Sequence, residues 1–467
     1  MKDILIRRAE IVNEGRKFAG SVLIGGERIK DVFPGDDIPF SVLQEAETID
    51  AEGCLLLPGA IDTHVHFRDP GLTQKGDIAT ESAAAVAGGV TSFLEMPNTV
   101  PPTVSLEAWA AKMERAAACS HANYAFYLGA TDDNLSVLQS ADYTRVPGIK
   151  LFLGSSTGHM LVSGPDIIDR IFRFSAESGV VVAAHCESEA LIRAHRAAFL
   201  AAEGAVDDLP LSFHRLIRDR EVCLSSSSAA VAAAARLGAR LHLLHVSTKD
   251  ELSLLDGRPF EDKKITAETC PHYLFFAHDE NGRLVLPGGE GHTHAVLGQA
   301  AFKCNPAVKD TADREALCRA VGEGLIDSFG TDHAPHLPAD KRGGALKAAS
   351  GMPSVQCFLP LLLELFPAET VALKAAHRPA SLFRMVDRGY IRKGYYADLV
   401  LVRPDSAWRV SAEGLLSPCG WSPYEGLTLR HRVERCFVNG CQVFNYAENP
   451  HQVLSGHQKS ITFAPRN

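Results

Sequence analysis

The segment that decides the fold is residues 55–68, which read LLLPGAIDTHVHFR. The part at 55–61 carries no charge and forms an apolar run of strand length, and Asp62, His64 and His66 follow at once. Buried parallel strands have near-continuous apolar sequences rather than alternating ones. The run is therefore predicted to be a buried strand, with the polar residues at its carboxyl end.

Seven more apolar runs of similar length follow along the chain, at 90–95, 124–129, 148–153, 180–184, 241–246, 265–269 and 325–329. Amphipathic or Ala-rich stretches lie between them, at 76–87, 106–118, 165–178, 225–237, 311–323 and 354–365. Eight strand–helix units predict an α/β fold of the TIM (β/α)8 barrel type. An open doubly wound sheet would give the same alternation, although the number of strands favours the barrel.

Both ends of the chain differ from this middle part. Residues 1–54 and 390–467 contain short β-type runs separated by Gly and charged turns. The barrel is therefore predicted at 55–389, with a β-rich piece on each side. One insertion, 276–298, is rich in Gly, His and Asp, and we expect it to form a loop over the barrel mouth.

The composition excludes several classes of protein. The 467 residues include 47 Lys and Arg against 56 Asp and Glu, so the formal charge is −9 and no basic block is available for nucleic acid. No run approaches the ~18 apolar residues that span a membrane. The 11 cysteines form no Cys-x-x-Cys pair, which predicts reduced thiols. We expect a soluble cytoplasmic protein that binds neither nucleic acid nor membrane.

Side chains that can bind metal lie at four of the eight predicted strand ends, and a fifth strand contains a lysine. The residues are His64, His66, Lys150, His185, His245 and Asp332. Active sites of TIM barrels lie at the carboxyl ends of the strands. Alternate residues of a strand face one side, so His64 and His66 can share an ion. Imidazole and carboxylate are zinc ligands, and their number favours a two-metal site over a single ion.

Each of these residues also has a purely structural interpretation. A single strand histidine is usually a packed core residue, and only the convergence of several strand ends favours metal binding. A buried Lys150 must be paired or lose its charge. A second His-x-His pair, His292 and His294, lies in the Gly-rich insertion, and we interpret it as part of a solvated loop.

Four motifs carry a resemblance to a known family. They read DTHVHFRDPG at 62–71, EMPNT at 95–99, IKLFLG at 149–154 and GTDHAPH at 330–336. With them the chain resembles the amidohydrolase superfamily, and within it the type I dihydroorotases, along nearly its whole length. The resemblance implies that 1–54 and 390–467 join in a small β-sandwich beside the barrel. One departure is Asp69, which stands where many members have Glu.

The resemblance also implies two Zn2+ ions per chain, held by six side chains. The more buried ion would be bound by His64, His66 and Asp332, and the other by His185 and His245. Lys150 would be converted to N6-carboxylysine, whose carbamate bridges both ions and removes the charge of a buried lysine. Asp332 would transfer the proton. Four further residues would hold the substrate: Arg68, Asn98, Asn305 and His336.

The implied reaction is the reversible cyclisation of N-carbamoyl-L-aspartate to L-dihydroorotate in pyrimidine biosynthesis. The resemblance further implies a homodimer, with an aspartate carbamoyltransferase as a candidate partner. Two alternatives remain open. Allantoinases and dihydropyrimidinases (hydantoinases) share the metal ligands but lack the arginine two residues after the second histidine. An inactive scaffold protein would have lost ligands, whereas all six are present here.

Overall fold

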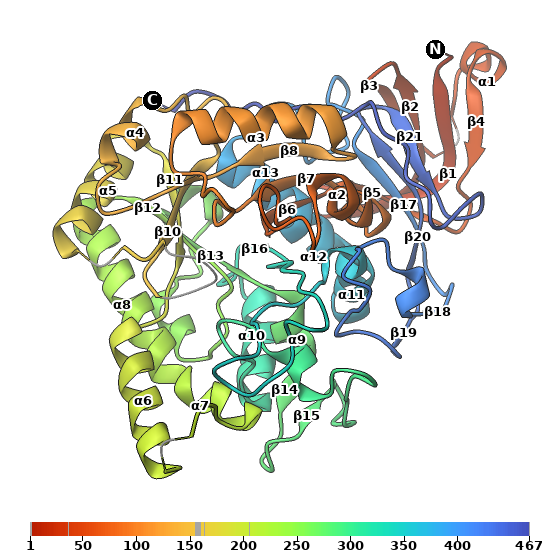
Figure 1. Cartoon of the computed structure of the whole chain (residues 1–467). Helices are drawn as coiled ribbons and strands as arrows, with labels where there is room; N and C mark the ends of the chain where they lie inside the picture. Colours follow the sequence, from red (N-terminus) through yellow and green to blue (C-terminus); the bar gives the residue numbers. More distant parts are fainter. Residues whose placement is uncertain (1, 36, 155–159, 163, 205, 467) are drawn as a thin grey trace.

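Parallel strands form the centre of the molecule in this computed structural model, which describes the chain except residues 1, 36, 155–159, 163, 205 and 467 (Figure 1). One parallel sheet has the order β6-β7-β8, and another has the order β16-β13-β12-β11-β10-β9. Their bounds are β6 Ala60–Val65, β7 Val90–Glu95, β8 Asn123–Phe126, β9 Leu128–Gly129, β10 Gly148–Phe152, β11 Val181–His185, β12 Arg240–Leu243, β13 Ile265–Thr269 and β16 Ser328–Phe329. These strands lie in or beside the eight predicted runs.

The two parallel sheets are joined at both of their ends. Strands β8 and β9 belong to one stretch of chain and are separated only by Tyr127. At the other end, Val65 of β6 pairs in parallel with His333, which follows β16. The amide of His66 also donates to the carbonyl of His333 at 2.8 Å. The first and last strands of the series therefore meet, and their carboxyl ends lie together.

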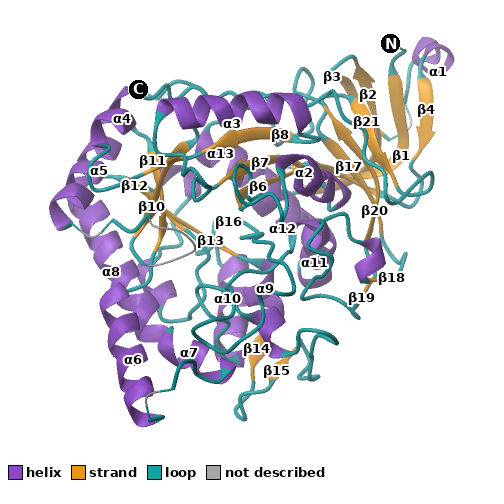
Figure 2. Cartoon of the chain, viewed as in Figure 1, coloured by secondary structure: helices purple, strands orange, loops and turns teal. Residues whose placement is uncertain are grey.

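Helices lie between consecutive strands along most of the chain (Figure 2). The α-helices of this part are α2 Ile78–Ala87, α3 Leu106–Cys119, α4 Leu135–Ser140, α5 Pro165–Ser178, α6 Glu189–Ala202, α7 His214–Ile217, α8 Arg220–Leu237, α9 Pro271–Phe275, α10 Thr311–Gly322, α11 Phe358–Leu365, α12 Ala368–Ala372 and α13 Arg378–Phe383. Local sequence fixes their ends, as in α2, where Asp77 and Thr80 form a capping box. Gly238 ends α8 with a φ of 75°, a conformation that favours glycine.

Short helical segments connect these elements. They are η1 Leu211–Phe213, η2 Glu251–Leu254, η3 Phe260–Asp262, η4 Gln299–Phe302, η5 Val355–Cys357, η6 Leu373–His377 and η7 Ala412–Gly414. Segment η6 is a π-helix, and the others are 3-10 turns. The helix predicted at 354–365 accordingly begins as the 3-10 turn η5 and becomes α-helical only at Phe358.

The two chain ends together build an eight-stranded sheet of order β21-β20-β17-β5-β1-β2-β3, in which β4 also pairs with β1. Its strands are β1 Ile4–Asn13, β2 Arg16–Gly25, β3 Arg28–Pro34, β4 Glu47–Asp50, β5 Leu55–Pro58, β17 Leu399–Arg403, β20 Arg432–Val438 and β21 Cys441–Asn445, with helix α1 Phe40–Glu45 before β4. The prediction of a single strand at 55–61 is wrong, because the run is divided between β5 and β6. That run is two strands, because β5 pairs with β1 and β17 while only β6 joins the parallel sheet.

The insertion at 276–298 is more ordered than the predicted loop. It contains the antiparallel pair β14 Ala277–His278 and β15 Leu284–Val285. His294 is 2% exposed, and its Nε2 lies 3.1 Å from a carboxylate oxygen of Glu425, which precedes β19 Thr428–Leu429, the partner of β18 Trp408–Arg409. The prediction that His294 is solvated is therefore wrong, because the chain end packs over it.

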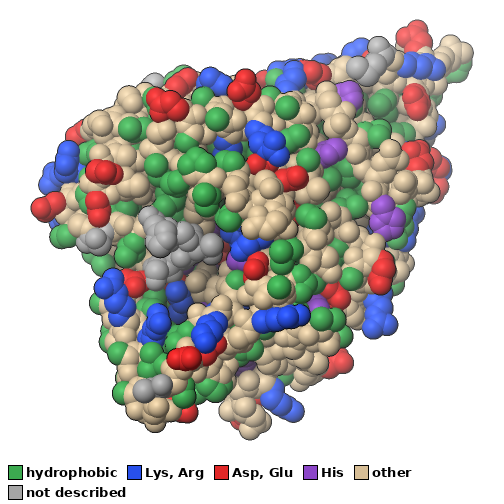
Figure 3. All heavy atoms as spheres, viewed as in Figure 1, with side chains coloured by type: hydrophobic (Ala, Val, Ile, Leu, Met, Phe, Trp, Pro, Cys, Tyr) green, Lys and Arg blue, Asp and Glu red, His purple; other side chains and the backbone are tan. Residues whose placement is uncertain are grey.

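Acidic and basic side chains are interspersed over the face shown in Figure 3. Among the helices of the described part of the chain, none is long and apolar enough to cross a membrane.

Candidate metal centre

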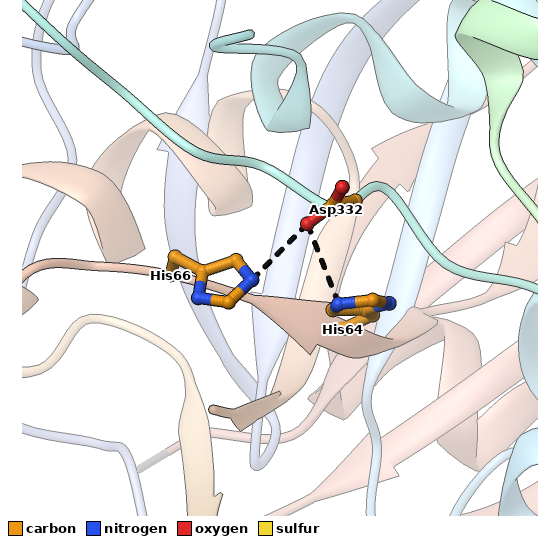
Figure 4. Close-up of side chains that lie close together, drawn as sticks. All are labelled: His64, His66 and Asp332. Atoms are coloured by element: carbon orange, nitrogen blue, oxygen red, sulfur yellow. Dashed lines mark ion pairs between the residues drawn. The ribbon is translucent and has the colours of Figure 1, made fainter. Parts of the chain in front are cut away.

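His64, His66 and Asp332 form a compact cluster where β6 and β16 end (Figure 4). Both imidazoles turn their Nε2 atoms toward the same carboxylate oxygen of Asp332, at 3.3 Å from His64 and 3.1 Å from His66. The three ligand atoms lie within 4.8 Å of one another. Two imidazole nitrogens and one carboxylate oxygen are a donor set that suits zinc, so the residues fit a metal ion.

The protonation states in this cluster also suit a metal, which needs neutral imidazole and ionised carboxylate. Burial lowers the pKa of His66 to about 3, so its ring is neutral. Burial alone would raise the pKa of Asp332, but the neighbouring His64 and His66 hold it well below its usual value. Asp332 is therefore ionised beside the neutral imidazole of His66.

His185 and His245 form a second pair next to this cluster. His185 ends β11, and its Nδ1 lies 2.8 Å from Nε2 of His245, which follows β12. The ring centroids of His245 and His64 are 5.3 Å apart, so the four histidines are one group. Burial lowers the pKa of both His185 and His245. The structure thus brings together all four histidines that the sequence predicted as ligands.

Lys150 lies in β10 and is 1% exposed. Its ammonium sits 4.4 Å from the centre of the Phe152 ring, and among the described residues no carboxylate forms an ion pair with it. Burial lowers the pKa of Lys150 to about 7, although Asp332 and Glu268 act in the opposite direction. A large share of the side chain is therefore a neutral amine near pH 7.

Arg68 is buried beside the cluster and is 2% exposed. Its Nε donates to the carbonyl of Pro335 at 3.1 Å, and its Nη2 lies 3.1 Å from Nε2 of His336. Within the described part of the chain no carboxylate pairs with this guanidinium. Asp69, its sequence neighbour, pairs with Arg115 instead. A buried arginine in this position calls for an anion.

Arg68 reaches the cluster through a turn of the backbone and not through the strand alternation expected for His64 and His66. Its φ is 67°, so the backbone turns at this residue rather than continuing the strand alternation. His245 and Asp332 also have positive φ values, of 42° and 47°. Non-glycine residues adopt this conformation at a cost and do so often at functional sites. Three of the predicted residues share this strained backbone.

The two predicted asparagines have different surroundings. Asn98 Oδ1 lies 2.7 Å from Nδ1 of His66, so Asn98 accepts a hydrogen bond that orients a cluster histidine. Asn305 has a buried Oδ1 with no hydrogen-bond partner among the described residues. A buried acceptor without a partner is costly, and a ligand would relieve that cost.

Glu268 contacts the cluster, and the sequence analysis did not single it out. It lies in β13, and its two oxygens receive hydrogen bonds from His64 Nδ1 at 2.6 Å and Thr63 Oγ1 at 2.8 Å. His242 Nε2 lies 3.3 Å away. Burial alone would raise the pKa of Glu268, but His64 and His242 lower it. A carboxylate inside an otherwise uncharged, buried strand was the available signal, because such a charge needs buried partners.

Parallel strands whose carboxyl ends bring together imidazoles and a carboxylate define an α/β protein with a candidate metal site. The chain belongs to the amidohydrolase family, since residues 55–443 match the model of that family. The predicted resemblance to this family is thereby confirmed.

Individual relatives carry three different activities in their names. The chain is 29% identical to a dihydroorotase of Methanosarcina acetivorans, with 91% of this chain and 89% of the relative covered. It is 30% identical to an allantoinase of Bacillus velezensis, with coverage of 95% and 94%. Among solved structures, the L-hydantoinase (dihydropyrimidinase) from Arthrobacter aurescens matches with a TM-score of 0.87 at 25% identity, covering 99% of this chain and 100% of that one.

Proposed function

We propose that this protein is a dihydroorotase, which interconverts N-carbamoyl-L-aspartate and L-dihydroorotate. The observation that carries the proposal is the buried Arg68, which lies beside the histidine cluster and has no carboxylate partner among the described residues. Dihydroorotate supplies a ring carboxylate, and the planar fork of a guanidinium matches a carboxylate with two parallel hydrogen bonds. Dihydrouracil has no such group.

The proposed architecture follows from the sheet topology. The strands β6 to β13, together with β16, would form one (β/α)8 barrel, with the cluster at its carboxyl end. The eight-stranded sheet would belong to a separate β domain built from residues 1–54 and 390–467, to which β5 adds one more strand. The joined ends of the two parallel sheets support this arrangement.

The residues present fit two zinc ions. His64, His66 and Asp332 would hold one ion, and His185 and His245 the other. Lys150 would bridge them as a carbamate, and the low pKa of about 7 favours this reaction because carbon dioxide combines with the neutral amine. Bound zinc would lower the pKa of a water molecule and polarise the amide carbonyl.

Other side chains of the site would transfer the proton and bind the substrate. Both contacts of Asp332 with the cluster histidines use Oδ1, so Oδ2 is available to accept a proton and return it to the ring nitrogen that leaves. Arg68 would bind the carboxylate of the substrate beside His336, and Oδ1 of Asn305, which has no partner among the described residues, would accept a hydrogen bond from a ring N–H. Asn98 would contribute mainly through His66.

A second candidate is an allantoinase or hydantoinase activity, which the names of the relatives favour. Turnover of dihydroorotate, allantoin and dihydrouracil by the same preparation, together with its zinc content, tests the proposal. We expect dihydroorotate to be the best substrate and two zinc ions per chain. A preference for allantoin or dihydrouracil would contradict the dihydroorotase assignment.

A further inference from the structure

The ring of His336 is held between two cations and a carbonyl. Lys75 Nζ lies 3.1 Å from its Nδ1. Arg68 Nη2 and the carbonyl oxygen of Ser350 each lie 3.1 Å from its Nε2. The backbone is held separately, because Trp421 Nε1 donates to the carbonyl of His336 at 2.7 Å. His336 is 2% exposed, so water does not complete these contacts.

These contacts decide which ring nitrogen carries the hydrogen. Burial lowers the pKa of His336 well below its usual value, and the charges of Arg68 and Lys75 lower it further, so the ring is neutral. A lysine ammonium can only donate, so Nδ1 must accept from Lys75. The hydrogen then lies on Nε2, where it can be donated to the carbonyl of Ser350. The opposite tautomer would point an N–H at the ammonium and a lone pair at the carbonyl.

The Nε2–H tautomer of His336 determines whether Arg68 can donate a hydrogen bond to this ring. A guanidinium also can only donate, and an Nε2 that carries hydrogen offers it no acceptor. The Nη2 group of Arg68 thus stays without a hydrogen-bond acceptor on His336, although it lies 3.1 Å away. With the opposite tautomer, Nε2 would accept from Arg68 and occupy that hydrogen.

We propose that Lys75 is a positioning residue, which holds His336 in the Nε2–H tautomer and so keeps the Nη2 hydrogens of Arg68 for the carboxylate of the substrate. This inference rests on the proposed function and adds the residue that prepares its carboxylate site. The neighbouring Asp340 explains why the ammonium of Lys75 is needed. One of its carboxylate oxygens lies 3.2 Å from Lys75 Nζ and 3.9 Å from Nδ1 of His336. Without the ammonium, Asp340 would attract a hydrogen to Nδ1.

The test compares the Lys75→Met and Lys75→Arg variants, with Lys347→Met as the matched control. Lys347 is an exposed lysine in the same region as Asp340, so its replacement removes an equal charge without touching His336. Three quantities are measured: KM and kcat for dihydroorotate, binding of orotate and of uracil, and the tautomer of His336 by 15N NMR of histidine-labelled protein. Orotate carries the ring carboxylate and uracil lacks it.

We expect Lys75→Met to raise KM and to weaken orotate binding by at least about tenfold, because a hydrogen bond to a charged group is lost. kcat should stay within about threefold, uracil binding should not change, and the NMR signal should show the hydrogen on Nδ1. Lys75→Arg keeps a donor and should restore binding. Lys347→Met should match the wild type in every measurement.

Two results would overturn the inference. One is a Lys75→Met protein in which the hydrogen stays on Nε2 of His336. The other is unchanged orotate binding in that protein while the wild type prefers orotate to uracil. Failure of the proposed function looks different, because the wild type itself would then neither turn over dihydroorotate nor prefer orotate. The NMR comparison would still decide the role of Lys75 in that case.

Discussion

Replacing Arg68 with Met should stabilise the ligand-free protein and at the same time abolish most activity on a carboxylate substrate. Arg68 is 2% exposed, and burial lowers its pKa from 12.5 to about 10. A difference of about 2.5 pKa units corresponds to roughly 3 kcal/mol for holding the charged form in this site. The lost hydrogen bond to Pro335 offsets about 1 kcal/mol of this. The free energy of unfolding should therefore rise by about 1–2 kcal/mol.

The kinetic effect should have the opposite sign, because the substrate supplies the missing anion. With methionine at 68, the carboxylate of dihydroorotate would enter a buried site without a partner. Breaking a buried charge pair by removing one member costs about 3–5 kcal/mol. This corresponds to a fall in kcat/KM of roughly 10²–10⁴-fold. Dihydrouracil carries no carboxylate, so any turnover of it should not fall.

Zinc analysis, denaturant unfolding of the ligand-free protein and initial rates with both substrates measure these effects. Arg193→Met is a matched control, because Arg193 is 71% exposed and forms a surface ion pair with Glu189 on the same helix. It should change neither stability nor turnover by much. If the Arg68→Met protein is clearly less stable than the wild type, the guanidinium of Arg68 already pairs with an anion of the folded protein. A fall in kcat/KM of less than tenfold would mean that the carboxylate of the substrate does not bind at Arg68.

Three further substitutions test the cluster itself. Lys150→Ala should lose most bound metal and turnover, and added short carboxylates should restore part of the rate by replacing the carbamate; full activity with two zinc ions per chain would contradict the bridging role. Asp332→Asn should lower kcat by about 10²–10⁴-fold with unchanged circular dichroism, and a loss under tenfold would assign the proton transfer to another group. Glu268→Gln should weaken metal affinity about 10–100-fold in chelator competition, because it holds Nδ1 of His64; equal affinity would make its role structural.

The sequence by itself determined the strand series and the ligand candidates. Apolar runs mark buried parallel strands, because both faces of such strands are covered. Residues that directly follow these runs lie at the carboxyl ends, which is why His64, His66 and Asp332 could be grouped although 266 positions separate His66 from Asp332. Short β-type runs separated by Gly and charged turns also distinguished the two chain ends from the middle part.

Only the tertiary structure decided which neighbours each polar group received. The split of the run at 55–61 into β5 and β6 depends on pairing with β1 and β17, and those strands are distant in sequence. The burial of His294 depends on Glu425, which the insertion cannot reveal. Strand alternation also does not predict the turn of the backbone at Arg68.

The hydrogen-bond partners of the candidate-site residues also come from elements that are distant in sequence. Glu268 behind His64 and Lys75 beside His336 come from other elements than the residues they orient. Hydrogen bonds and charge pairs act over a few ångströms in space, whatever the separation along the chain. Periodicity and local motifs report the local backbone and which residues are buried. They do not report which donor meets which acceptor, and in this protein that pairing sets the charge of the cluster and the direction of the Arg68 guanidinium.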